Sequence, residues 1–188
     1  MKIVLASASP RRRELLSLVC DSFDVRVSNA DESYGSDTPL TQIPKILAEK
    51  KALGVPLNED EIIIGCDTVV ICQNEIMGKP KSREDAIRML ESYSDNTHLV
   101  VSGICVRTDK KLYSESVVSK VTMRALSRHE IEKYVDTAQP YDKAGAYGIQ
   151  EMAGAFVSAI EGDFYNIVGL PLCRLTEILK NELGVELI

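Results

Sequence analysis

Apolar residues along the chain follow two patterns. Where they alternate with polar residues or form a continuous run they predict a strand, and where they recur every three or four residues they predict a helix. The expected strands are 3–6, 23–28, 62–71, 99–106, 112–123 and 155–160. The run 62–71 is almost wholly apolar, which is typical of a central strand buried on both faces. Strands and helices alternate at first, and a hairpin around 108–110 follows. The order predicts an α/β fold with a mixed sheet.

Capping residues mark where the expected helices begin. Pro10 suits the first position of a helix that runs to about Val19, with Ser9 before it as N-cap. The other helices are expected to begin after Thr41, after Ser82, after Ser127 with Glu130 in a capping box, and at Pro171. The polar stretch 31–39 predicts a loop, and 144–154 is rich in glycine.

Length and composition limit the kinds of protein this can be. A chain of 188 residues with 45% hydrophobic residues fits one globular domain, 1–188, which admits two lobes. No apolar run approaches the roughly 20 residues that span a bilayer, and the first residues leave no room for a signal peptide. We therefore expect a cytoplasmic protein without membrane contact. The net charge of −6 argues against stable nucleic-acid binding, so phosphate chemistry would depend on local basic clusters.

Cysteine and histidine offer no metal or disulfide framework. The five cysteines are scattered and form no C-x-x-C pair, and we expect Cys66, Cys72 and Cys105 to be small buried apolar groups. The only histidines are His98 and His129, too few for a histidine metal cluster. We expect a structural role for His98 and a solvated position for His129.

Three consecutive arginines, Arg11 to Arg13, occupy the first turn of the expected helix that starts at Pro10. The free N–H groups and the dipole already make that end of a helix positive, so three cations there cost stability unless an anion binds. Ser7 and Ser9 add hydroxyl donors beside them. This segment predicts a phosphate site; the alternative is that the long side chains simply extend into water.

Asp67 is the second anomaly, because a carboxylate within a long apolar strand is costly to bury unless it is paired or bound to a metal. A catalytic role and a structural ion pair both remain open for it. Glu32, Lys51 and Lys79 are individually weak signals. Together with Asp67 and the arginines, however, they supply what phosphoryl chemistry needs: carboxylates for a divalent cation and cations for phosphate oxygens.

The common nucleotide and hydrolase motifs are missing. The sequence contains no G-x-x-x-x-G-K-[ST], no G-x-G-x-x-G and no G-x-S-x-G. A P-loop, a Rossmann turn and a Ser-His-Asp hydrolase are therefore unsupported.

Several segments together resemble the Maf family of nucleotide pyrophosphatases. They are Leu5-Ala-Ser-Ala-Ser-Pro-Arg-Arg12, Asp31-Glu32, Lys51-Ala52, Gly65-Cys-Asp-Thr68, Gly78-Lys-Pro80, Ala144-Gly-Ala-Tyr-Gly-Ile-Gln150 and Tyr165-Asn-Ile-Val-Gly-Leu-Pro-Leu172. The segments follow the family's order over nearly the whole chain, which makes their joint occurrence specific.

The resemblance implies an elongated, twisted mixed sheet flanked by helices, with two lobes and a central cleft, similar to the inosine triphosphate pyrophosphatases. It implies that a nucleoside triphosphate, dTTP or UTP, is hydrolysed to the monophosphate and pyrophosphate with a divalent cation (Mg²⁺, Mn²⁺ or Co²⁺). Modified pyrimidine triphosphates are further candidate substrates, in a house-cleaning or division-linked role, and the resemblance leaves room for a homodimer.

The resemblance also suggests residue roles. It implies that Asp67 is the proton acceptor, and that Arg11, Thr68 and Gln150 take part in substrate choice. Our hypothesis adds the following: Glu32 and Asp67 hold the metal, Lys79 assists catalysis with them, and the phosphates are bound by Ser7, Arg11, Arg12 and Lys51. The sequence departs from the family pattern at Cys66 and at Glu151, and Glu151 places a charge beside Gln150.

Two other functions remain open at the level of the sequence. A nucleotidyltransferase would also combine an apolar first strand, an arginine and a later Lys-Pro, although such enzymes usually have glycine in the loop that Ser7 to Arg12 occupies. A non-catalytic nucleotide-binding regulator of septum formation is the third reading, and the cost of burying Asp67 argues against it.

Overall fold

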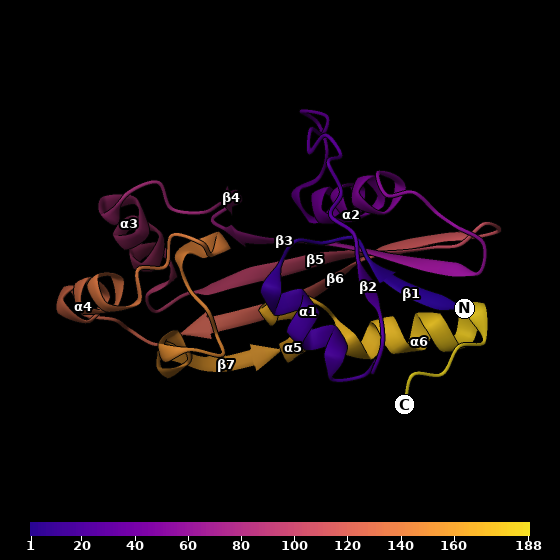
Figure 1. Ribbon diagram of the computed structural model, residues 1–188. Helices are drawn as coiled ribbons and strands as arrows, with labels where there is room; N and C mark the ends of the chain where they lie inside the picture. The colour runs from indigo at the N-terminus through magenta and orange to yellow at the C-terminus, as the bar shows by residue number, and fades with distance from the viewer. The chain divides into compact units, whose positions relative to one another are not determined.

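The structure is a computed structural model that describes residues 1–188, and it alternates strands with helices (Figure 1). The strands are β1 (Lys2–Leu5), β2 (Asp24–Val25), β3 (Glu61–Cys72), β4 (Glu75–Met77), β5 (Thr97–Arg107), β6 (Leu112–Met123) and β7 (Val157–Glu161). The α-helices are α1 (Pro10–Ser17), α2 (Ile43–Leu53), α3 (Arg83–Tyr93), α4 (Arg128–Ala138), α5 (Phe164–Val168) and α6 (Leu172–Leu183). Short 3₁₀ helices are η1 (Leu40–Gln42), η2 (Ala144–Ala146) and η3 (Met152–Phe156).

The seven strands form one mixed sheet in the order β2-β1-β3-β5-β6-β7, with β4 paired to β3 off this path. Strand β1 is parallel to both β2 and β3, whereas β4 and β7 run antiparallel to their partners. The α/β class and the mixed sheet are thus confirmed. Strand β3 lies between β1 and β5, so the prediction of a buried central strand from its apolar run is also confirmed.

The chain divides into two compact units. The first comprises Met1–Thr68, Ser102–Val117 and Gly169–Ile188, and the second comprises Val69–Val101 and Val118–Val168. Within the first unit, α2 covers one face of the strands, and α1 and α6 lie on the other face (Figure 1). The prediction of a single domain with a cleft between two lobes stays a prediction.

Close packing of α2 on β3 depends on Gly65. A Cβ atom at Gly65 would lie 2.2 Å from the carbonyl oxygen of Ala48 and 3.0 Å from the Cβ of Ala52. Both alanines belong to α2 and are fully buried. The missing side chain therefore lets the helix backbone touch the strand, which fixes the distance between α2 and β3 two residues before Asp67.

We expect Gly65→Ala to lower the free energy of unfolding by about 1–3 kcal/mol, because the added methyl group meets backbone and α2 must shift. Urea denaturation measures this change. Gly78→Ala is the matched control, since nothing lies within 4 Å of a Cβ built at Gly78. Equal stability of the two variants would show that α2 does not depend on this contact.

The second unit is built around α3 and α4, which lie side by side (Figure 1). Ser82 caps α3 by accepting a hydrogen bond from the backbone N–H of Asp85, and Ser127 and Glu130 form a complete capping box at α4. Both predicted helix starts are confirmed. The signal is local in each case, because a hydroxyl three residues before a free N–H can accept from it.

His98 is a structural residue in the second unit, as expected. It is buried, its Nε2 lies 2.7 Å from the hydroxyl of Tyr147, and its ring stacks on Tyr93. Burial lowers the pKa of His98 to about 4, so the ring is neutral at physiological pH. The thiols expected to be buried, Cys66, Cys72 and Cys105, are buried, and His129 is exposed.

Some boundaries differ from those predicted. Of the expected strand 23–28, only β2 is a strand, although the backbone N–H of Arg26 still donates to the carbonyl oxygen of Leu5 at the end of β1. Helix α2 begins after η1, with Gln42 as its N-cap where Thr41 was expected. Ser9 is the N-cap of α1, but its side chain makes no capping hydrogen bond. The sequence did not indicate β4, α5 or the 3₁₀ helices.

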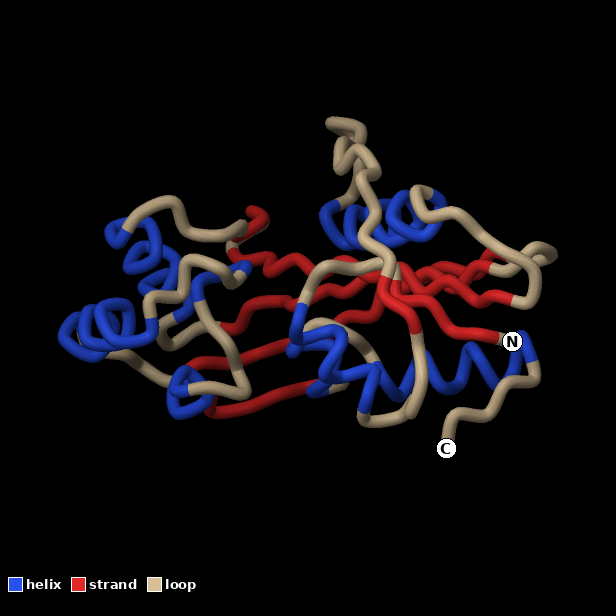
Figure 2. Tube along the Cα trace, viewed as in Figure 1, coloured by secondary structure: helices blue, strands red, loops and turns tan.

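The loop between β2 and η1 extends beyond α2 (Figure 2). It contains 31–39, the stretch predicted to be irregular, and Glu32 within it is exposed. No helix in the structure has both the length and the apolar character to span a membrane.

Candidate active site

The site forms where β3 continues past the end of β1. Strand β1 pairs with β3 only as far as Leu5 opposite Ile64, and the chain then turns through Ser7 into α1. On this side, Asp67 and Thr68 therefore lie beyond the last residue pair with β1, and both are partly exposed, whereas β3 is buried up to Cys66. In open α/β sheets, ligands bind at the carboxyl ends of parallel strands, and this is such an end.

Asp67 belongs to a charged cluster with Lys51 and Glu32. The ammonium Nζ of Lys51 lies 2.5 Å from Oδ1 of Asp67 and 3.0 Å from Oε1 of Glu32. The side chains of Lys51 and Asp67 are 15% and 14% exposed, and that of Glu32 is 64% exposed. The ion pair that the sequence left open as a structural alternative thus exists. It involves the same residues that were expected to hold a metal.

Helix α2 carries Lys51, and the loop between β2 and η1 carries Glu32, so that both side chains lie close to Asp67. Lys51 is in the last turn of α2, where the helix dipole favours a cation. The neighbouring Lys50 holds the loop, because its Nζ donates to the carbonyl oxygen of Ser33 at 2.7 Å. Hydrogen bonds from the Ser33 hydroxyl and backbone N–H hold the pKa of Asp31 below its usual value, so Asp31 stays charged beside Lys50. Glu32 lies between these two anchored residues.

Arg12 forms a second cluster at the start of α1. Its Nε donates to the carbonyl oxygen of Gly169 at 3.0 Å, and its two terminal nitrogens donate to Oγ of Ser7 at 3.2 Å and Oγ1 of Thr68 at 3.3 Å. These acceptors are all uncharged, and α1 has no acidic residue in its first turn. A guanidinium has five N–H donors, so Arg12 keeps donors and a full positive charge for an anion.

The two clusters lie on opposite faces of β3. Successive residues of a strand point to opposite faces, so Asp67 faces α2 while Thr68 faces α1 and α6. Both faces meet at the strand edge that β1 leaves uncovered. A ligand at this edge, beside the start of α1, can reach Arg12 from one side and the carboxylates from the other.

Two participants were missed by the sequence reasoning. Ser102 in β5 is buried, and its hydroxyl lies 2.8 Å from that of Thr68. The carbonyl oxygen of Gly169 accepts from Arg12, from the thiol of Cys66 at 3.3 Å and from Thr68 at 3.4 Å. Gly169 has φ of +130°, which only glycine adopts readily. Its place in a motif before the last helix was the only available signal.

Cys66, the departure from the family pattern, points to the Arg12 side of the strand. Its thiol is buried and contacts Gly169. Burial raises the pKa of this thiol, with the nearby Arg12 acting in the opposite direction. The residue therefore packs as a neutral group behind the site, which agrees with the expectation of a small buried cysteine.

The remaining predicted residues are found in both units. Arg11 is half-buried in the first turn of α1, within the first unit. Lys79 and Gln150 belong to the second unit, and both are exposed. Glu151, which places a charge beside Gln150, is paired with Lys143 at 3.3 Å, so part of that charge is neutralised.

The donor set fits a divalent cation whose remaining ligands are phosphate oxygens and waters. Two carboxylates from different elements, Asp67 and Glu32, converge on one ammonium, and Oδ2 of Asp67 is left for a water or an ion. The structure contains no group of three or more His, Cys, Asp or Glu side chains placed to hold a metal. Mg²⁺ is commonly bound by one or two carboxylates together with phosphates and waters, and the pair satisfies that requirement.

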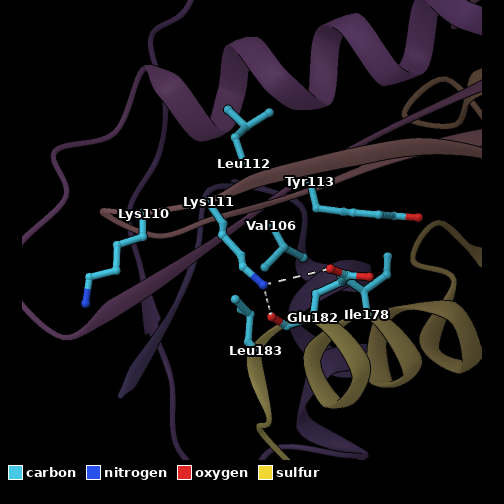
Figure 3. Close-up of a pocket in the computed structure, with 8 residues that line it drawn as sticks. All are labelled: Val106, Lys110, Lys111, Leu112, Tyr113, Ile178, Glu182 and Leu183. Carbon is cyan, nitrogen blue, oxygen red and sulfur yellow. Dashed lines mark hydrogen bonds and ion pairs between the residues drawn. The ribbon is translucent and has the colours of Figure 1, made fainter.

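A separate pocket of about 290 Å³ lies between the β5–β6 hairpin and the end of α6 (Figure 3). It is lined by Val106, Lys110, Lys111, Leu112, Tyr113, Ile178, Glu182 and Leu183. Lys111 turns to the helix end, where its Nζ donates to the carbonyl oxygen of Glu182 at 2.6 Å. None of the predicted site residues lines this pocket.

Comparison with known proteins identifies the family. The model of the family described as "Maf-like protein" matches residues 2–182. The dTTP/UTP pyrophosphatase of Clostridium novyi (strain NT) is 43% identical over 192 residues, covering 100% of both chains. That of Clostridium beijerinckii is 48% identical over 185 residues, covering 96% of this chain and 98% of the relative.

Another relative is the dTTP/UTP pyrophosphatase of Parabacteroides distasonis, 46% identical over 184 residues, which cover 96% of this chain and 95% of the relative. A solved structure, the Staphylococcus aureus Ham1 protein, matches with a TM-score of 0.46 and 13% identity, covering 65% of this chain and 72% of that one. The family match spans the residues of both clusters, Ser7 to Gly169, and the relatives cover the chain almost completely. The chain belongs to the Maf family.

Proposed function

We propose that this protein hydrolyses dTTP and UTP to the monophosphate and pyrophosphate with the help of a divalent cation. The observation that carries the proposal is the pairing of two features at one strand edge. Arg12 is a half-buried cation whose hydrogen-bond partners are uncharged, and beside it Asp67 and Glu32 converge on a single cation. The names of the relatives supply the substrate class.

In the proposed reaction, Asp67 orients a water molecule and accepts its proton as the water oxygen attacks the α-phosphorus. A bond forms between that oxygen and phosphorus, the bond from the α-phosphorus to the α,β-bridging oxygen breaks, and pyrophosphate leaves with the electron pair. Arg12, Lys51 and Lys79 neutralise charge on the phosphate oxygens. A divalent cation held by Asp67 and Glu32 would supply Lewis-acid polarisation of those oxygens.

Ser7, Arg11 and Thr68 complete the proposed phosphate and substrate contacts. Ser7 already accepts hydrogen bonds from Arg12 and from the backbone N–H of Ser9, so its own hydroxyl proton can point to an anion. Gln150 offers an amide donor and acceptor that suit a pyrimidine edge. The pairing of Glu151 with Lys143 supports this choice, since it reduces the negative charge beside Gln150.

The setting we propose is the cytoplasm, where free nucleotides and Mg²⁺, Mn²⁺ or Co²⁺ are available. The proposed partners are nucleoside triphosphates, with no stable nucleic-acid complex, in keeping with the net charge of −6. A house-cleaning role against modified pyrimidine triphosphates and assembly as a homodimer belong to the same proposal.

Pyrophosphate release over a panel of canonical and modified triphosphates tests the function. We expect kcat/KM for dTTP and UTP to exceed that for ATP and GTP by about tenfold or more, because recognition of a base by hydrogen bonds discriminates at least this well. A requirement for added divalent cation is expected as well. Formation of a nucleotide sugar without pyrophosphate release from triphosphate alone would favour a nucleotidyltransferase. Tight binding without turnover would favour a regulator.

A further inference from the structure

Lys51 holds two carboxylates that a divalent cation would also need. Its Nζ contacts Oδ1 of Asp67 at 2.5 Å and Oε1 of Glu32 at 3.0 Å. Without a cation between them, these two like charges would repel each other. Lys51 therefore keeps the two carboxylates together in this structure, as a metal ion bound between them would.

Lysine and a divalent cation cannot both make these contacts. A metal coordinated by the same oxygens would lie within a few ångströms of the ammonium, and the two positive charges would repel. The lysine stem is flexible and carries its charge as a compact head, so Nζ can leave without movement of α2. Lys51 is only 15% exposed, so its ammonium group needs a new anionic partner within the site when it leaves the carboxylates.

We propose that Lys51 is a place-holder cation that competes with the divalent cation for Asp67 and Glu32 and moves to the phosphates when a nucleotide enters. The first half of this proposal concerns the protein and metal alone, and the second half rests on the proposed function. It follows that the divalent cation binds weakly to the nucleotide-free protein. Metal and triphosphate then bind cooperatively, because the triphosphate takes the lysine away from the carboxylates.

The test is titration of the nucleotide-free protein with Mn²⁺, followed by calorimetry or by the electron paramagnetic resonance signal of free Mn²⁺. Lys51→Met should bind Mn²⁺ about tenfold more tightly than the unaltered protein, within the usual range of coupling between sites. Adding Asp67→Asn to Lys51→Met should abolish the gain. Loss of the gain would place the tighter site at these carboxylates and not elsewhere on an acidic surface.

Lys50→Met is the matched control. It removes the same charge one residue away, but Lys50 contacts Asp31 and Ser33, not Asp67 or Glu32. Its Mn²⁺ affinity should rise by no more than about twofold, since Lys50 does not contact Asp67 or Glu32. Loss of its hydrogen bond to Ser33 also loosens the loop that carries Glu32, which acts against tighter binding. Lys51→Arg keeps the competing charge and should also show no gain. If circular dichroism shows Lys51→Met to be unfolded, Lys51→Gln takes its place.

The place-holder role is overturned if Lys51→Met binds Mn²⁺ no more tightly than the unaltered protein does, or if Lys50→Met shows the same gain. The coupling half has its own measurement, in which Mn²⁺ affinity is compared with and without a non-hydrolysable α,β-methylene triphosphate. The nucleotide should raise Mn²⁺ affinity by a larger factor in the unaltered protein than in Lys51→Met; equal factors would overturn this half. Because the first titration contains no nucleotide, it can succeed even if the triphosphate panel shows no hydrolysis.

Discussion

Replacing Asp67 with asparagine is expected to lower kcat for dTTP by about 10²- to 10⁴-fold, the usual contribution of a positioned proton acceptor. Asparagine has nearly the shape of aspartate but can neither accept the proton of water nor hold a cation by charge. KM should change much less than kcat, because phosphate binding is assigned to Arg12 and its neighbours. Initial rates of pyrophosphate release at saturating Mg²⁺ measure both constants.

The competing explanation is that Asp67 only pairs with Lys51 to stabilise the fold. Asp24→Asn controls for this, because Asp24 also pairs with a lysine, Lys2, at 2.7 Å, and Arg26 is near it as well. Both substitutions remove one carboxylate from a lysine ion pair in the first unit. If Asp67→Asn and Asp24→Asn lose similar activity, or if Asp67→Asn retains the unaltered rate, the assignment of Asp67 to catalysis is wrong.

The parts of the fold that could be predicted are those with a local cause. The apolar run of β3, the Ser82 cap and the Ser127–Glu130 box depend on residues close in sequence, and each is present as expected. The length of β2 depends instead on how many of its residues pair with β1, and a local sequence pattern does not contain this information. The N-cap of α2 shifted for a similar reason, since η1 adds a turn before the helix.

For the site, the sequence could reveal residues whose type is costly in their surroundings. Asp67 in an apolar strand and Arg12 at a helix start were found in this way. Gly169 could not be found, because it contributes a backbone carbonyl that every residue has, and only its φ of +130° in the folded chain makes it special. Ser102 could not be predicted either, since a single serine in a strand indicates a site only when the fold places its hydroxyl beside that of Thr68.

The second large effect is expected for Arg12. Arg12→Met should lower kcat/KM for dTTP by about 10²- to 10³-fold, the loss that follows removal of one preorganised donor to a developing anion. Arg13→Met removes the same charge from the same helical turn, but Arg13 is exposed, and we expect a change of no more than about threefold. Steady-state kinetics on the two purified variants gives the comparison.

Arg12 also fastens α1 to Thr68 and Gly169, so a loss of activity could arise from a displaced helix and not from a missing phosphate contact. Arg12→Lys tests whether the positive charge alone is enough, because lysine keeps the charge at the helix start but cannot reproduce the planar fork that reaches Ser7, Thr68 and Gly169. If phosphate binding needs only the charge, Arg12→Lys will resemble the unaltered protein. If the fork must be held in place, Arg12→Lys will lose nearly as much kcat/KM as Arg12→Met, and we expect this result because the fork's three acceptors fix the direction of its free donors. Similar activity of Arg12→Met and Arg13→Met would mean that the anion binds elsewhere.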